Sequence, residues 1–125
     1  MDHDHQTPWG RQVTDELRAP YRDLRQAIPD VLAGYAALHR AAMDDGALSA
    51  KTKELIALAV AITRECDGCI AAHARAAFRR GASDAEVAEM IGVAIMMNGG
   101  PGTVWGPRAL AAYREAAAAD APTPE

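Results

Sequence analysis

The sequence has no excess of basic residues, no long apolar run and no secretory signal pattern. Its 13 basic residues are outnumbered by 17 acidic ones, and the formal net charge is -4. Without an excess of positive charge to neutralise phosphates, it is not expected to bind nucleic acid. The longest apolar run, LIALAVAI, is far too short to span a bilayer, and the opening MDHDHQTPWG lacks the pattern of a secretory signal. We expect a cytoplasmic protein with neither a nucleic-acid nor a membrane partner.

Aromatic residues are also scarce, at 5% of the sequence with a single Phe, whereas alanine occurs 29 times among the 125 residues. Alanine favours helix and lets helices approach closely, but each alanine buries little apolar surface. A domain of this size has room for one core, and a core built on alanine is marginally stable by itself. The composition therefore predicts a single-domain, all-α bundle whose apolar faces are completed by oligomerisation.

Hydrophobic spacing and helix-end signals predict about six helices. A polar segment at residues 1–12 and a tail at residues 120–125 are expected to lack stable structure, which leaves a helical domain at residues 13–119. Pro20 is expected to kink or break the first helix, and a glycine-rich turn is expected before the last one, at residues 98–102. The predicted helices span roughly residues 13–27, 29–44, 50–64, 66–80, 84–97 and 104–119.

The only two cysteines, Cys66 and Cys69, are separated by two residues, and His73 follows four residues later. At the start of a helix, unpaired backbone N–H groups and the positive end of the helix dipole stabilise a thiolate over a thiol. The spacing places both sulfurs and the imidazole on nearly one helix face, where His73 can take a proton from a thiol.

A thiolate beside a second thiol is the arrangement that peroxide reduction needs. One sulfur attacks the O–O bond and becomes a sulfenic acid, and the other condenses with it to a disulfide. Because Cys69 lies one helical turn from His73, we assign Cys69 as the attacking sulfur and Cys66 as the resolving one.

A carboxylate earlier in the chain could complete a proton relay. Glu54 lies early in the apolar third helix, where it is either exposed or held buried for a reason. Glu65 is adjacent to Cys66, but a carboxylate there would disfavour the thiolate. Glu54 is therefore the better candidate.

Two other interpretations of the cysteines and His73 stay open. Cys66, Cys69 and His73 could hold a structural zinc ion in a non-catalytic helical oligomer. A structural zinc site wants four ligands, however, and nothing in the sequence pairs His39 or Glu54 with the three. The cysteines could also be inert. His39 is otherwise expected to be an ordinary surface or interface histidine.

Glu54, followed by eleven residues and then by Cys66-x-x-Cys69-x-x-x-His73, resembles the active-site pattern of the alkylhydroperoxidase D-like branch of the carboxymuconolactone decarboxylase family. The similarity extends through CDGCIAAHARAAFRRGASDAEVAEMIGVAIMMNGGPG and covers roughly residues 30–118. The joint spacing of Glu, Cys, Cys and His is more specific than a bare CxxC.

The resemblance implies an all-helical homotrimer or homohexamer that reduces hydroperoxides. In it Cys69 attacks the peroxide, Cys66 resolves the sulfenic acid, and Glu54 and His73 relay protons. A dithiol or a lipoylated protein supplies the electrons, and no cofactor is expected. One position departs from the pattern, because the family's peroxidases have a second histidine where this sequence has Gly68. The departure predicts slow peroxide reduction or a different substrate.

Overall fold

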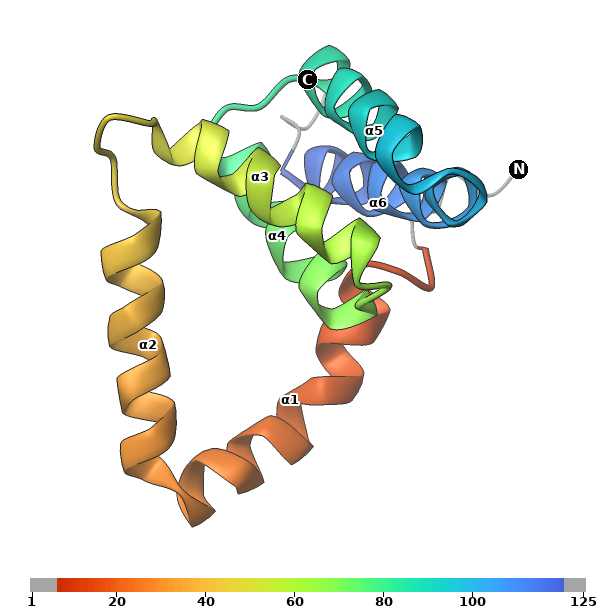
Figure 1. The fold of residues 1–125 in the computed structure, drawn as a ribbon. Helices are drawn as coiled ribbons and strands as arrows, with labels where there is room; N and C mark the ends of the chain where they lie inside the picture. Colours follow the sequence, from red (N-terminus) through yellow and green to blue (C-terminus); the bar gives the residue numbers. More distant parts are fainter. Residues whose placement is uncertain (1–6, 121–125) are drawn as a thin grey trace, which may run out of the picture.

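The computed structural model describes residues 7–120 (Figure 1). The predicted all-α class is confirmed, because this part of the chain forms six helices and no strand. None of these helices is long and apolar enough to cross a membrane. Most of the predicted tail and residues 1–6 lie outside the described residues. The helices are α1 (Arg11–Ala27), α2 (Pro29–Met43), α3 (Ala50–Thr63), α4 (Asp67–Arg79), α5 (Asp84–Asn98) and α6 (Gly100–Ala119).

Helices α3 to α6 form the compact part of the molecule, with α4 and α5 both packed along α6 (Figure 1). Alanines from all four of these helices are buried between them and allow the close approach that the composition predicts. The core contains few large side chains, so each buried one contributes a large share of the hydrophobic stabilisation. The largest fully buried side chains are Leu58, Ile62, Ile70 and Val87.

Helices α5 and α6 are joined by Gly99 alone, so the predicted turn at residues 98–102 is wrong. Gly99 has a φ of 69°, a left-handed conformation that favours glycine. Helix α6 then starts at Gly100, with Pro101 in its first turn, where the missing N–H of proline has no cost. Glycine and proline, which usually indicate a turn, here begin a helix.

Gly102 of α6 packs directly on the backbone of α5. A Cβ at this position would lie 2.8 Å from the Cα of Ile95, closer than real Cβ atoms approach. We therefore expect Gly102→Ala to lower the free energy of unfolding by about 1–3 kcal/mol, since the two helices would have to separate. Chemical denaturation of the variant and the wild-type protein measures the difference.

Gly92→Ala is the matched control for this prediction. Gly92 lies inside α5, and a Cβ there meets nothing within 4 Å. Alanine in such a helix interior is more favourable than glycine by about 0.5–1 kcal/mol, so this variant should be the more stable one. Equal stabilities of the two variants would contradict the close approach of α5 and α6.

Helices α1 and α2 extend away from the compact part and form two sides of an open triangle (Figure 1). Helix α2 has no buried residue, and Val13 is the one buried residue of α1. Helix α1 continues through Pro20, so the predicted break does not occur. The two helices leave large apolar side chains exposed, namely Leu17, Tyr21, Leu24, Val31, Tyr35 and Leu38.

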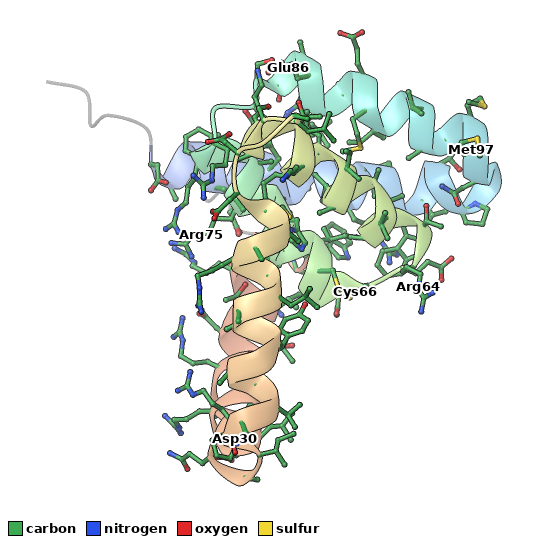
Figure 2. All side chains as sticks on the ribbon, turned by 60° about the vertical axis from the view of Figure 1, so that its left-hand side comes forward. Asp30, Arg64, Cys66, Arg75, Glu86 and Met97 are labelled. Atoms are coloured by element: carbon green, nitrogen blue, oxygen red, sulfur yellow. A yellow bond between two sulfur atoms is a disulfide. The ribbon has the colours of Figure 1, made fainter. Side chains whose placement is uncertain are left out.

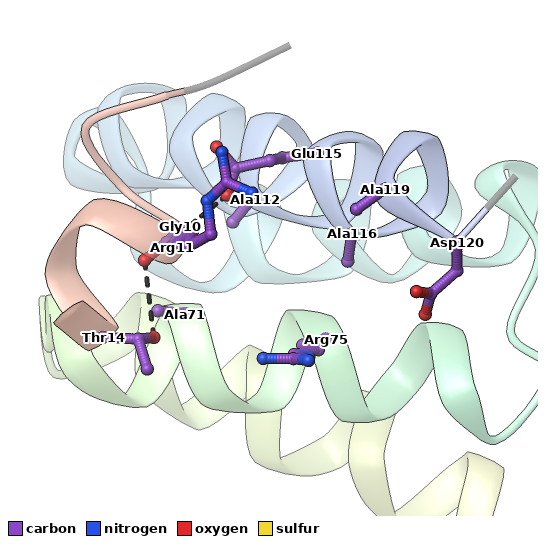
Figure 3. Close-up of a pocket in the computed structure, with 10 residues that line it drawn as sticks. All are labelled: Gly10, Arg11, Thr14, Ala71, Arg75, Ala112, Glu115, Ala116, Ala119 and Asp120. Carbon is purple, nitrogen blue, oxygen red and sulfur yellow. Dashed lines mark hydrogen bonds between the residues drawn. The ribbon is translucent and has the colours of Figure 1, made fainter. Parts of the chain in front are cut away.

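A buried carboxylate holds the start of α1 against α6 (Figure 3). Glu115 accepts hydrogen bonds from the backbone N–H groups of Thr7 and Arg11, at 2.7 and 2.6 Å. Gly10 lies directly on this carboxylate, because a Cβ there would overlap one of its oxygens. A small cavity of about 120 Å³ opens beside it between α1, α4 and α6. The anchor determines where α1 leaves the compact part and which of its side chains lie over α4.

Candidate active site

A tight turn between α3 and α4 places the cysteines at the start of α4. Glu65 in this turn has a φ of 53°, a left-handed conformation that is uncommon for residues other than glycine. The turn lets the N–H of Cys66 donate to the carbonyl of Ala61 at 3.1 Å, and Cys66 forms the N-cap of α4. Cys66 and Cys69 therefore lie at the helix start that the sequence predicts, beside backbone N–H groups that favour a thiolate.

Cys66 and Cys69 form a disulfide, with their Cα atoms 5.2 Å apart (Figure 2). The sulfur of Cys66 also accepts a hydrogen bond from the backbone N–H of Cys69 at 3.3 Å. The structure thus shows the oxidised form of the pair. Across residues 7–120, no three His, Cys, Asp or Glu side chains are grouped so that they could hold a metal ion.

Glu54, which is buried, and His73, which is half-buried, form a pair between α3 and α4. Oε2 of Glu54 lies 2.8 Å from Nδ1 of His73, and Glu54 is only 4% exposed. A carboxylate this deeply buried is costly unless it is paired, and the imidazole supplies the partner. Of the two possibilities for Glu54, the structure shows the buried one, whereas Glu65 is exposed.

One cavity of about 840 Å³ brings Cys69, Glu54 and His73 together, between α1, α2, α3 and α4. Cys69 is exposed at its wall, whereas Cys66 is half-buried and does not line it. A molecule in the cavity therefore meets the sulfur of Cys69 first. The roles of these residues in a reaction remain predictions. The α1 side of the cavity is lined mainly by Leu17, Arg18, Tyr21, Arg22 and Arg25.

The structure adds His39 to this site. Its ring stacks on the ring of His73, with centroids 6.1 Å apart and planes inclined by 16°, and it lines the same cavity. His39 is exposed, as expected of a surface histidine, and it also lines this cavity. No sequence motif includes it, because it lies on α2, far from the cysteines in the chain. Tyr35 lies one helical turn before His39 on α2 and also lines the cavity, so the two side chains share a helix face. This spacing is the one feature of the sequence that links His39 to a neighbour at the site.

A side chain of α1, that of Leu17, lies next to Gly68. A Cβ at Gly68 would lie 3.0 Å from Cδ1 of Leu17, so a histidine at this position would displace the leucine. In this chain the imidazoles near Cys69 come instead from His73 of α4 and His39 of α2. The departure from the peroxidase pattern at Gly68 is thus accompanied by a second imidazole from another helix.

Comparison with known proteins agrees with this fold. An uncharacterized protein of Haemophilus influenzae is 51% identical over 107 residues, which cover 86% of this chain and 94% of that protein. An uncharacterized protein of Cupriavidus necator is 37% identical over 98 residues, or 78% of this chain and 87% of that protein. The crystal structure of apo-lpg0406, a carboxymuconolactone decarboxylase family protein from Legionella pneumophila, matches with a TM-score of 0.84 and 34% identity, covering 88% of this chain and 98% of that one. The profile of the family itself matches residues 29–118. The chain therefore belongs to the carboxymuconolactone decarboxylase family.

Proposed function

We propose that the protein is a CxxC-dependent hydroperoxide reductase or thiol–disulfide oxidoreductase of the alkylhydroperoxidase D-like branch. The observation that carries the proposal is that Cys69, one half of a disulfide, lines the same cavity as the Glu54–His73 pair. Two sulfurs that can bond, one of them accessible from a cavity that contains a proton acceptor, are what dithiol redox chemistry requires. The decarboxylase branch of the family does not depend on such a pair.

The proposed cycle begins when the Cys69 thiol gives its proton to His73, whose imidazolium is then paired with Glu54. The thiolate attacks the terminal oxygen of a hydroperoxide R–O–O–H. An S–O bond forms, the O–O bond breaks, and the RO⁻ fragment takes up a proton and leaves as an alcohol. Cys69 is now a sulfenic acid, and the Cys66 thiol condenses with it to give the disulfide and water.

A reductant must then return two electrons and two protons to the disulfide. We propose a small dithiol or the dihydrolipoyl group of a carrier protein, because a dithiol opens a disulfide by exchange and closes into its own disulfide. The position of Cys66 and Cys69 at the start of α4 supports this step, since the helix dipole stabilises the thiolate that leaves.

We also propose that the protein acts as a homotrimer or homohexamer. Large apolar side chains of α1 and α2 are between 46% and 64% exposed. Met96 and Met97, near the end of α5, are 71% and 73% exposed. Exposed apolar surface on this scale is typical of interaction sites, and further copies of the chain would bury it.

Thiol titration of the reduced protein tests the proposed activity. One equivalent of hydroperoxide should lower the count from two thiols per chain to none, with an equal loss of peroxide, and a dithiol should restore both thiols. Two thiols that persist beside unreacted peroxide would contradict a peroxidase. Oxidation by lipoamide disulfide without oxidation by peroxide would favour the oxidoreductase alternative.

A further inference from the structure

The cavity contains two imidazoles, and the cycle described above uses one of them. His73 is held by Glu54 at 2.8 Å. His39 stacks on the face of His73, with ring centroids 6.1 Å apart, and forms no hydrogen bond or ion pair with a described residue. The two rings therefore share one cavity but differ in their surroundings.

Cleavage of a hydroperoxide by a thiol requires two proton transfers in opposite directions. The attacking thiol must lose a proton, and the leaving RO⁻ fragment must gain one. His73 suits the first transfer, because the Glu54 carboxylate stabilises the imidazolium that results. The second transfer, to the leaving fragment, can use a separate donor, and the other imidazole that lines the cavity is that of His39.

We infer that His39 is the general acid that protonates the leaving oxygen of the peroxide, an inference that rests on the proposed function. Imidazole is the side chain whose ordinary pKa lets it donate and accept protons near neutral pH. Within residues 7–120, no carboxylate is hydrogen-bonded to or ion-paired with His39, whereas Glu54 is paired with His73. The proton passes from the His39 imidazolium to RO⁻ as the O–O bond breaks, and the ring regains a proton from water in the open cavity.

The placement of α2 supports this role. Helix α2 buries none of its residues, so its position contributes little to the core. It does bring Tyr35 and His39, which lie one turn apart on the same helix face, to the cavity. At Gly68, next to Cys69, an added Cβ would lie 3.0 Å from Cδ1 of Leu17, so a side chain there would press on the leucine. Apart from that of His73, the imidazole in this cavity is that of His39, which α2 contributes.

Two oxidants with different leaving groups test the inference on the reduced protein. Tert-butyl hydroperoxide releases tert-butoxide, a strong base that must be protonated, whereas peracetic acid releases acetate, which needs no proton donor. His39→Phe keeps an aromatic ring to stack on His73 but cannot donate a proton. In single-turnover oxidation followed by thiol titration, it should react about 10²-fold more slowly with tert-butyl hydroperoxide and at nearly the wild-type rate with peracetic acid.

Arg40→Ala is the matched control, because it removes an exposed side chain of α2 that does not line the cavity. It should react with both oxidants at nearly the wild-type rate. Added imidazole should restore the reaction of His39→Ala with tert-butyl hydroperoxide. An equal loss with both oxidants in His39→Phe, or no loss with either, would overturn the role of His39 and leave the proposed function standing. A wild-type protein that reacts with neither oxidant would overturn both the role of His39 and the proposed peroxidase activity.

Discussion

Cys69→Ser should abolish hydroperoxide turnover, because the variant lacks the sulfur that the cavity exposes to substrate. Cys66→Ser should still react once with peroxide, since Cys69 keeps its place in the first turn of α4 beside His73. Without a resolving thiol, the product is a sulfenic acid on Cys69 or a mixed disulfide with the reductant. Mass spectrometry after trapping with dimedone distinguishes these products, and peroxide loss under excess dithiol gives the turnover.

The two variants are controls for each other, because each loses one sulfur and neither can form the disulfide of Cys66 and Cys69. A sulfenic acid that appears on Cys66 in the Cys69→Ser variant would reverse the assignment of the two roles. Turnover at the wild-type rate in both variants would remove the disulfide from the mechanism altogether.

Glu54→Gln should lower the rate of Cys69 oxidation by about 10²-fold or more, since an amide cannot stabilise the imidazolium that forms when His73 accepts a proton. The carboxylate is 4% exposed and 2.8 Å from Nδ1 of His73, so little water is present to replace it. Glutamine has nearly the same size and still reaches the ring, which keeps the local packing. Rapid quenching of the reduced protein with excess hydroperoxide, followed by thiol titration, measures the rate.

Glu115→Gln is the matched control for this prediction. Glu115 is also a buried carboxylate, at 8% exposed, but it accepts hydrogen bonds from the backbone of Thr7 and Arg11 and does not line the large cavity. Both substitutions should lower the free energy of unfolding, because each weakens a buried hydrogen bond to a charged group. Only Glu54→Gln should lower the rate at saturating peroxide. Equal losses of rate would mean that Glu54 holds the structure together and does not move a proton.

Helix ends could be predicted where local side chains form them. Ser83 and Glu86 make the capping box that begins α5, with hydrogen bonds in both directions between side chain and backbone. The start of α6 could not be predicted in the same way. Gly100 and Gly102 usually indicate a turn, yet the contact of Gly102 with the backbone of α5 requires a residue without a side chain inside the helix.

The sequence by itself determined the all-α class and the arrangement of Cys69 and His73, because the helical period of 3.6 residues places them on one face of α4, with Cys66 as its N-cap. The tertiary structure decided which residues from other helices lie against them. The crossing of α3 over α4 buries Glu54 against His73, and α2, separated from α4 by a whole helix, brings His39 to the same ring. These contacts depend on how helices pack and where α1 is anchored, which no spacing along the chain encodes.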